Sequence, residues 1–281
     1  MVKQIKNVFK AGVNFMINAN NMTPAGRYIN EAIVNAAMER NTEIFHNGMK
    51  MILAVPNSLS LWRAKTFSTK EPETLSWIDS IKEKSIFWDV GANVGLYSIY
   101  AAKKKYCKVW CFEPSVFNLE LLARNSYLND LTENICIVPL ALSDRSEDSK
   151  MQLTTKAWGG ALSTFGKDFG WDGQEIKKIF EYRTLGISMD VAVSLLKIPS
   201  PDYIKIDVDG LEHFILNGGL SVLQSVKEIL IEVNDDFLAQ RDQCNTLLSQ
   251  AGLKLKSKLQ SEIVATSAHG FQNSFNQIWT R

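Results

Sequence analysis

The sequence predicts an α/β fold with a mostly parallel sheet and helices on both faces. From residue 85 onward, short apolar runs alternate with helical patterns, as in strand–helix–strand units. The runs are apolar throughout rather than alternating with polar residues. Such runs are typical of strands that are buried on both faces, which is how parallel sheets bury their strands.

The core is expected to span residues 81–281, and its elements follow from the apolar pattern. Apolar runs predict five strands, at 86–90, 109–112, 135–138, 203–206 and 228–232. Helical spacing predicts helices at 96–102 and 116–128. Two further segments, at 253–259 and 275–279, are expected to close the sheet as a C-terminal antiparallel pair.

An insertion at about 150–190 separates the third and fourth strands, and it is longer than a usual crossover. Its aromatic and glycine residues are typical of segments that line or cover a site. The alternative is an exposed excursion with some helix of its own.

Residues 1–80 are expected to form an N-terminal helical extension that packs on the core. A good helix-forming stretch at 31–40 and a turn at 46–48 precede a short strand-like run at 49–55. The first segment is amphipathic, with apolar residues on one helical face and lysines on the other: Ile5, Val8, Phe9, Val13 and Met16 against Lys3, Lys6 and Lys10. Such a helix most often packs on its own domain or on a second subunit, so a homodimer is plausible. Contact with a membrane surface is the less favoured alternative.

Composition narrows the class of protein. Apolar residues make up 46% and charged residues 22% of the 281 residues, and the net charge is +1, which is the profile of a globular protein without the basic field of a nucleic-acid binder. A small-molecule or sugar substrate fits better. The four cysteines form no CxxC pair, and the histidines (His46, His213 and His269) do not cluster with them, so we expect no structural zinc. Neither a signal peptide nor a transmembrane segment is visible, and we expect a cytoplasmic protein.

The strongest motif is a glycine turn between the first strand and the following helix. Gly91 and Gly95 let the backbone approach a ligand at the strand end, where the first helical N–H groups point. Asp89 precedes the turn, where a carboxylate can meet an ammonium group. Glu113 ends the next strand, where an acid can accept both hydroxyls of a ribose. The turn lacks the G-x-G-x-x-G that binds a pyrophosphate, so a nucleoside with an amino-acid moiety is favoured over a dinucleotide.

The motifs together resemble the FkbM-type methyltransferases. The resemblance rests on segments 89–98, 112–114, 119–129, 141–144 and 204–212, in that order. It implies a class I methyltransferase sheet of the Rossmann-like type, bound S-adenosylmethionine with S-adenosylhomocysteine as product, and transfer to an oxygen of a sugar, polyketide or related acceptor. Asp209 departs from the glutamate more usual in this family.

The resemblance also implies roles for single residues. Asp89, Gly91, Asn93 and Gly95 would hold the amino-acid half of the cofactor, and Glu113 would hold the ribose. The adenine would be bordered by Leu142, Ser143 and Asp144, although Asp144 is equally well interpreted as a loop cap.

Catalytic candidates cluster after the fourth strand, at the edge of an α/β sheet where ligands bind. An alcohol must lose its proton as it attacks, so a carboxylate or imidazole is needed as base. Asp207 is the first choice because it ends the strand, His213 is the second and Glu212 the third. Glu212 has an alternative role at the next helix start, and His213 is equally compatible with a core contact. An acid cluster of this kind can also bind a divalent metal that lowers the pKa of the acceptor, but this is the less favoured alternative and no metal is predicted.

Acceptor-binding candidates are Trp158, Ser163 and Glu232, the first two from the insertion and the third from the end of the fifth strand. The sequence thus predicts an S-adenosylmethionine-dependent O-methyltransferase acting on a sugar, glycan or related small molecule. The alternatives are a nicotinamide-dependent oxidoreductase of the same fold and a non-catalytic scaffold that binds the cofactor.

Overall fold

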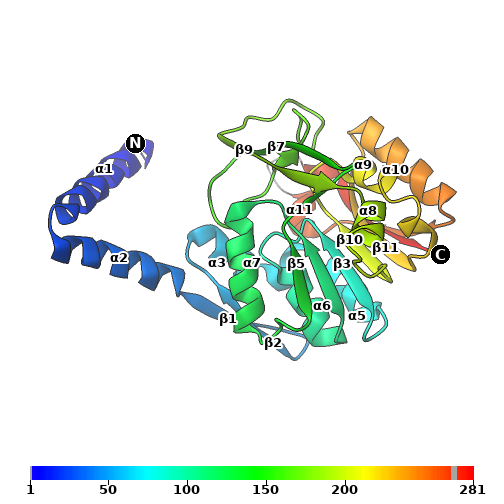
Figure 1. The fold of residues 1–281 in the computed structure, drawn as a ribbon, viewed down its shortest axis with the longest axis horizontal. Helices are drawn as coiled ribbons and strands as arrows, with labels where there is room; N and C mark the ends of the chain where they lie inside the picture. The colour runs from blue at the N-terminus through cyan, green and yellow to red at the C-terminus, as the bar shows by residue number, and fades with distance from the viewer. Residues whose placement is uncertain (1, 267–270) are drawn as a thin grey trace.

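A seven-stranded sheet forms the centre of the protein in a computed structural model, which describes residues 2–266 and 271–281 (Figure 1); His269 lies outside them. The strands are β3 (Ile86–Val90), β4 (Lys108–Phe112), β5 (Ile135–Val138), β10 (Tyr203–Ile206), β11 (Glu228–Asn234), β12 (Lys254–Leu259) and β13 (Ser274–Thr280). Their order is β12-β13-β11-β10-β3-β4-β5. Strands β11, β10, β3, β4 and β5 are parallel, and β13 is antiparallel to both β11 and β12. The predicted α/β fold with its C-terminal antiparallel closure is confirmed.

Helices cover both faces of this sheet because successive side chains of each strand point to opposite sides. In β3, Phe87 packs with one core cluster and Trp88 with the other, and both are fully buried. The first cluster includes residues of α5 (Pro72–Ser80), α6 (Leu96–Lys105) and α7 (Val116–Leu128). The second includes residues of α8 (Met189–Ser194), α9 (Glu212–Asn217) and α10 (Leu238–Gln250).

The insertion folds as a small sheet of its own. It contains β6 (Ala141–Leu142), β7 (Glu147–Leu153), β8 (Thr164–Phe165) and β9 (Phe180–Ile187), in the order β6-β9-β7-β8. The alternative of an exposed excursion with its own helix is therefore wrong. Strands β7 and β9 pair over seven positions. This pairing provides hydrogen-bond partners for the backbone N–H and C=O groups of a segment that does not join the main sheet.

The N-terminal extension divides into two parts. The hairpin of β1 (Asn41–His46) and β2 (Met49–Ala54) packs on α7, where Asn125 Oδ1 accepts from Ala54 N at 2.7 Å. The short helices α3 (Ser58–Lys65) and α4 (Phe67–Lys70) follow it into the core.

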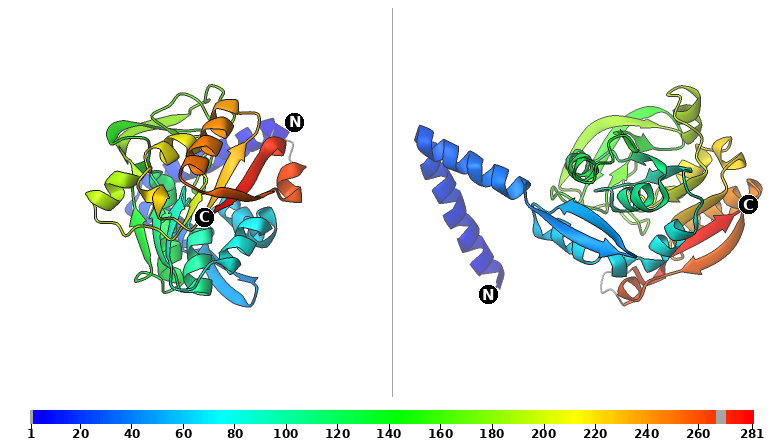
Figure 2. Two further views of the ribbon diagram at one scale, coloured as in Figure 1. Left: turned by 90° about the vertical axis from the view of Figure 1, so that its right-hand side faces the viewer. Right: turned by 90° about the horizontal axis from the view of Figure 1, so that it is seen from below.

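Helices α1 (Val2–Asn21) and α2 (Pro24–Met38) instead extend away from the body (Figures 1 and 2). The expectation that all of residues 1–80 pack on the core is wrong for these two helices. Their side chains are almost all exposed, because α2 leads into the outer hairpin rather than onto a face of the sheet. In the described part of the chain, no helix has both the length and the apolarity to cross a bilayer.

The remaining elements are short: α11 (Glu262–Ala265) and the 3-10 turns η1 (Val222–Gln224) and η2 (Phe271–Asn273).

Candidate active site

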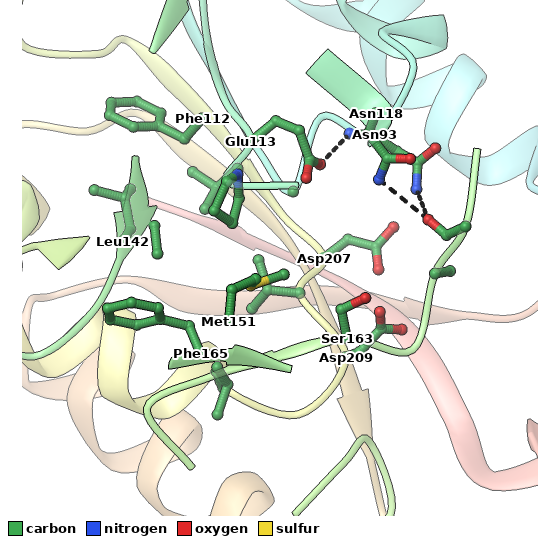
Figure 3. Close-up of a pocket in the computed structure, with 18 residues that line it drawn as sticks. Asn93, Phe112, Glu113, Asn118, Leu142, Met151, Ser163, Phe165, Asp207 and Asp209 are labelled. Atoms are coloured by element: carbon green, nitrogen blue, oxygen red, sulfur yellow. Dashed lines mark hydrogen bonds between the residues drawn. The ribbon is translucent and has the colours of Figure 1, made fainter. Parts of the chain in front are cut away.

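A pocket lies where β3, β4 and β10 end, with the insertion as its opposite wall (Figure 3). It contains about 570 Å³ of empty space, including the open solvent at its mouth. Of the predicted site residues, five line it: Gly91, Asn93, Glu113, Ser163 and Asp207. The edge of the sheet predicted from the sequence is therefore the edge that carries the pocket.

The glycine turn fixes the floor of this pocket. Gly91 has φ +78°, and a Cβ atom there would lie 1.9 Å from the carbonyl oxygen of Asp207. Only glycine allows the turn after β3 and the loop after β10 to lie this close. Gly95, with φ +82°, precedes α6 and packs against Leu122, where a Cβ atom would lie 2.4 Å from Cδ1. Gly95 does not line the pocket, so its role is to place the helix rather than to touch a ligand.

Two asparagines connect the turn to the insertion. Asn93 Nδ2 and Asn118 Nδ2 both donate to the carbonyl oxygen of Gly160, at 2.7 and 3.1 Å (Figure 3). Asn118 Oδ1 in turn accepts from Gly159 N at 3.1 Å. The sequence analysis missed Asn118, because its partners are about forty residues away and no local pattern marks them.

Glu113 faces the pocket with its carboxylate already oriented. Its Oε2 accepts from the backbone N–H of Asn93 and its Oε1 from that of Ser115, each at 2.8 Å. Burial raises the pKa of Glu113 to about 7, even though these two hydrogen bonds lower it. Each oxygen still has a lone pair free for a second donor, so the group can accept the hydroxyls of a ribose.

A buried lysine joins the two acids at the centre of the sheet. Lys205 Nζ lies 3.0 Å from Asp207 Oδ2 and 3.8 Å from Asp89 Oδ1. Burial alone would raise the pKa of Asp207, but the ammonium groups of Lys205 and Lys70 outweigh it and lower the pKa to about 2. Asp207 is thus ionised throughout the physiological pH range.

Two other acids near Asp207 are shifted the opposite way. Burial and the charge of Asp207 raise the pKa of Asp209 to about 6, and Asp209 Oδ2 accepts from Leu162 N at 2.7 Å. Burial and the charges of Asp207 and Glu71 raise the pKa of Glu232 far above its usual value. Glu232 is half-buried and does not line the pocket. Asp207 is therefore the ionised carboxylate of this group.

The other two catalytic candidates lie beneath the pocket rather than in it. Glu212 accepts from the backbone N–H groups of Val208 and Gly210, each at 3.0 Å, and from Gln240. His213 is 2% exposed and its ring lies 4.1 Å from that of Phe214. Burial lowers the pKa of His213 to about 4. Glu212 therefore stabilises the loop after β10, and His213 belongs to the core.

Of the residues predicted to border the adenine or to bind the acceptor, most lie outside the pocket, whereas Leu142 and Ser163 line it. Ser143 and Asp144 lie just past the pocket, with Ser143 Oγ donating to Asp144 Oδ1 at 3.2 Å. Trp158 packs with a cluster around Val94 rather than facing the pocket. The apolar wall consists of Phe112, Leu142, Met151 and Phe165, of which only Leu142 was predicted to border the adenine.

The comparisons with known proteins agree with this geometry. The methyltransferase FkbM domain model matches residues 89–273. The chain belongs to this family. The hexuronic acid methyltransferase AglP of Haloferax volcanii is 28% identical over 178 residues, which cover 62% of this chain and 66% of AglP. The chain therefore spans slightly less than two thirds of that relative. The resemblance predicted from the motifs is confirmed.

Two solved structures are similar to the chain at low sequence identity. Methyltransferase FkbM from Methylobacillus flagellatus has a TM-score of 0.46 at 14% identity and covers 90% of this chain and 59% of its own. TYW2 from M. jannaschii, in complex with AdoMet, has a TM-score of 0.45 at 15% identity and covers 86% of each chain.

S-adenosylmethionine is the cofactor that family membership implies, and the pocket fits it. Among the described residues, Asn93 Oδ1 and Asp89 Oδ1 are buried acceptors without a hydrogen-bond partner. Asn93 could therefore accept from the ammonium group of the cofactor. Asp89 is 1% exposed and does not line the pocket, and burial raises its pKa although Lys205 and Ser98 lower it. Glu113 would hold the ribose, and the apolar wall would enclose the adenine.

Proposed function

We propose that this protein transfers a methyl group from S-adenosylmethionine to a hydroxyl of a sugar, glycan or related small acceptor. The observation that carries the proposal is that one pocket is lined by Asn93 and Glu113, which are suited to hold the cofactor, and by an ionised carboxylate, Asp207. The cofactor supplies an electrophilic methyl group on a cationic sulfur. The chain must then orient the acceptor oxygen and accept its proton.

Asp207 is suited to accept that proton despite its low pKa. The oxygen becomes acidic as it is methylated, since a protonated ether is a far stronger acid than any carboxylic acid. A carboxylate with a pKa of about 2 can therefore accept the proton late in the transfer. Lys205, at 3.0 Å from Asp207 Oδ2, keeps the carboxylate ionised beforehand and fixes its orientation.

The charge around the pocket also favours a cationic ligand. Asp89, Glu71 and Asp207 are buried or half-buried acids, and the buried Lys205 and half-buried Lys70 offset only part of their charge. A ligand with a net positive charge, such as this cofactor, completes the balance.

The sugar acceptor is supported by a relative rather than by the pocket itself. AglP is described as a hexuronic acid methyltransferase. Ser163 and Asp209 line the pocket beside Asp207 and provide a hydroxyl and a carboxylate for the hydroxyl groups of a sugar ring.

The test combines calorimetric titration of S-adenosylmethionine with transfer of a labelled methyl group to a panel of uronic acid and neutral hexose glycosides. Asp207→Asn should bind the cofactor within a few-fold of the wild type and lose on the order of 10²–10⁴ in turnover. Asp148→Asn, an exposed acid on β7, is the matched control and should change neither. Absence of cofactor binding in the wild type would refute the proposal, and full activity of Asp207→Asn would refute the role of Asp207.

A further inference from the structure

Helices α1 and α2 form an N-terminal arm, residues 2–38, that carries an unusual share of the exposed apolar surface. Among the described residues, twelve large hydrophobic side chains of the arm are exposed, against fourteen in the rest of the protein. Phe9 is 75% exposed and Ile33 is 61% exposed. Apolar surface of this extent on one projecting segment marks an interaction site.

The two helices meet at a specific elbow. Asn30 Nδ2 donates to Ile17 O at 3.0 Å and to Asn21 Oδ1 at 2.9 Å, and Asn20 Nδ2 donates to Asn30 Oδ1 at 3.0 Å. At Gly26 a Cβ atom would lie 2.0 Å from the carbonyl oxygen of Asn20, so only glycine allows this crossing. The angle between the helices is therefore fixed by side chains of the arm itself.

Although the elbow is well defined, the described body of the protein offers the arm no surface to pack on. Isolated helices of this length are marginally stable in water, and helices in proteins are stabilised mainly by packing an apolar face. The described side chains of α1 include no buried residue, and in α2 only Gly26 is buried. A segment with a defined elbow and no packing partner in the described body of the protein needs that partner from elsewhere.

We propose that the partner is a second copy of this chain, with the two arms packed on each other in a symmetric dimer. If each of the twelve side chains buries on the order of 80 Å², about half of what a buried aromatic residue contributes, the arm loses roughly 1,000 Å² of exposed surface. A standard interface buries about 800 Å² per partner, so the arm alone suffices. Symmetric pairing also requires only one patch, because the same surface is used twice.

Charge favours a second copy over a lipid surface. In α1 the cations are Lys3, Lys6 and Lys10, fewer than the roughly four to eight of a typical lipid-binding cluster, and most of its other polar residues are asparagines. In α2 the single cation, Arg27, is balanced by Glu31. The arm as a whole therefore has only a weak attraction for anionic lipids, whereas its apolar faces are broad.

The test is the mass of the full-length protein in solution, measured by light scattering at micromolar concentration. The wild type should have twice the 31.6 kDa mass of one chain. Phe9→Asp and Met16→Asp should each convert it to the single-chain mass, with the affinity for S-adenosylmethionine and the melting temperature of the body unchanged. Asn14→Asp, which adds the same charge on the polar side of α1, should remain dimeric.

Two outcomes would overturn the proposal. One is a wild type with the mass of a single chain, and flotation of that monomer with phosphatidylcholine–phosphatidylserine vesicles would assign the arm to a membrane instead. The other is a dimer that survives both aspartate substitutions, which would place the interface elsewhere. Neither outcome depends on methyl transfer.

Discussion

Cofactor binding should depend on pH through Glu113. This carboxyl group lines the pocket, and its pKa is about 7 because it is buried. Only the ionised form has both oxygens available to accept from a ribose diol while keeping the hydrogen bonds from Asn93 N and Ser115 N. The affinity should therefore fall as the pH drops through 7.

The size of the effect follows from the pKa. With a pKa of about 7, roughly one tenth of Glu113 is ionised at pH 6 and roughly nine tenths at pH 8. The association constant should therefore rise about tenfold between these two values, if only the ionised form binds. Glu113→Gln should remove this dependence. At pH 8 it should also weaken binding by about 10- to 100-fold, since hydrogen bonds to a charged group contribute about 1.5–3 kcal/mol.

The assay is calorimetric titration of S-adenosylmethionine at pH 6, 7 and 8, read as the ratio of wild-type to Glu113→Gln affinity. The ratio is needed because an α-amino group titrates near 8, and because Asp209, with a pKa of about 6, lines the same pocket. Both contributions cancel in the ratio. Glu133→Gln, an exposed carboxyl outside the pocket, is the control. A ratio that stays constant from pH 6 to pH 8 would refute the reasoning.

Three further substitutions test the framework of the site. Lys205→Met leaves Asp89 and Asp207 without their shared cation and should lower the free energy of unfolding by about 3–5 kcal/mol, measured by urea denaturation; a loss below 1 kcal/mol would contradict a paired role. Gly91→Ala forces a Cβ atom against Asp207 O and should abolish cofactor binding or folding, which titration and circular dichroism would detect; normal binding would contradict the close approach. The pKa of Glu212 is about 7 in the folded protein and about 4.5 in the unfolded chain. Its ionisation should therefore reduce the free energy of unfolding by on the order of 3 kcal/mol as the pH rises from 4.5 to 7. In Glu212→Gln that part of the pH dependence should disappear from denaturation curves, and an unchanged pH profile would argue against the buried charge.

The parts of the fold that follow from local patterns were predictable. The five parallel strands each correspond to an apolar run, whereas the closing pair corresponds to segments of mixed polarity. The glycine turn follows from glycines directly after a strand. The small sheet of the insertion was not predictable in this way. Its strands β7 and β9 lie more than twenty-five residues apart, and what marks them is their pairing with each other rather than a buried apolar run.

Most residues of the apolar wall could not be predicted from the sequence, for the same reason. Met151 and Phe165 come from paired strands of the insertion, and only the tertiary fold brings them opposite Phe112 and Leu142. In the sequence alone, Met151 and Phe165 cannot be told apart from ordinary core residues. Trp158 was favoured for its large aromatic face, but Asn57 Nδ2 and Ser60 Oγ donate to its backbone oxygen, and its ring packs away from the pocket.

The pairing of Lys205 shows what strand register adds to a sequence. Residues two apart on a strand share a face, so Lys205 and Asp207 could have been paired from spacing alone. That Lys205 also lies beside Asp89 depends on β10 being adjacent to β3, where these two residues are register partners. On the other side, Lys205 is the register partner of Leu230, two residues before Glu232. One buried cation thus lies beside an acid behind the cofactor wall and an acid in the pocket, so its loss should lower turnover by freeing the orientation of Asp207.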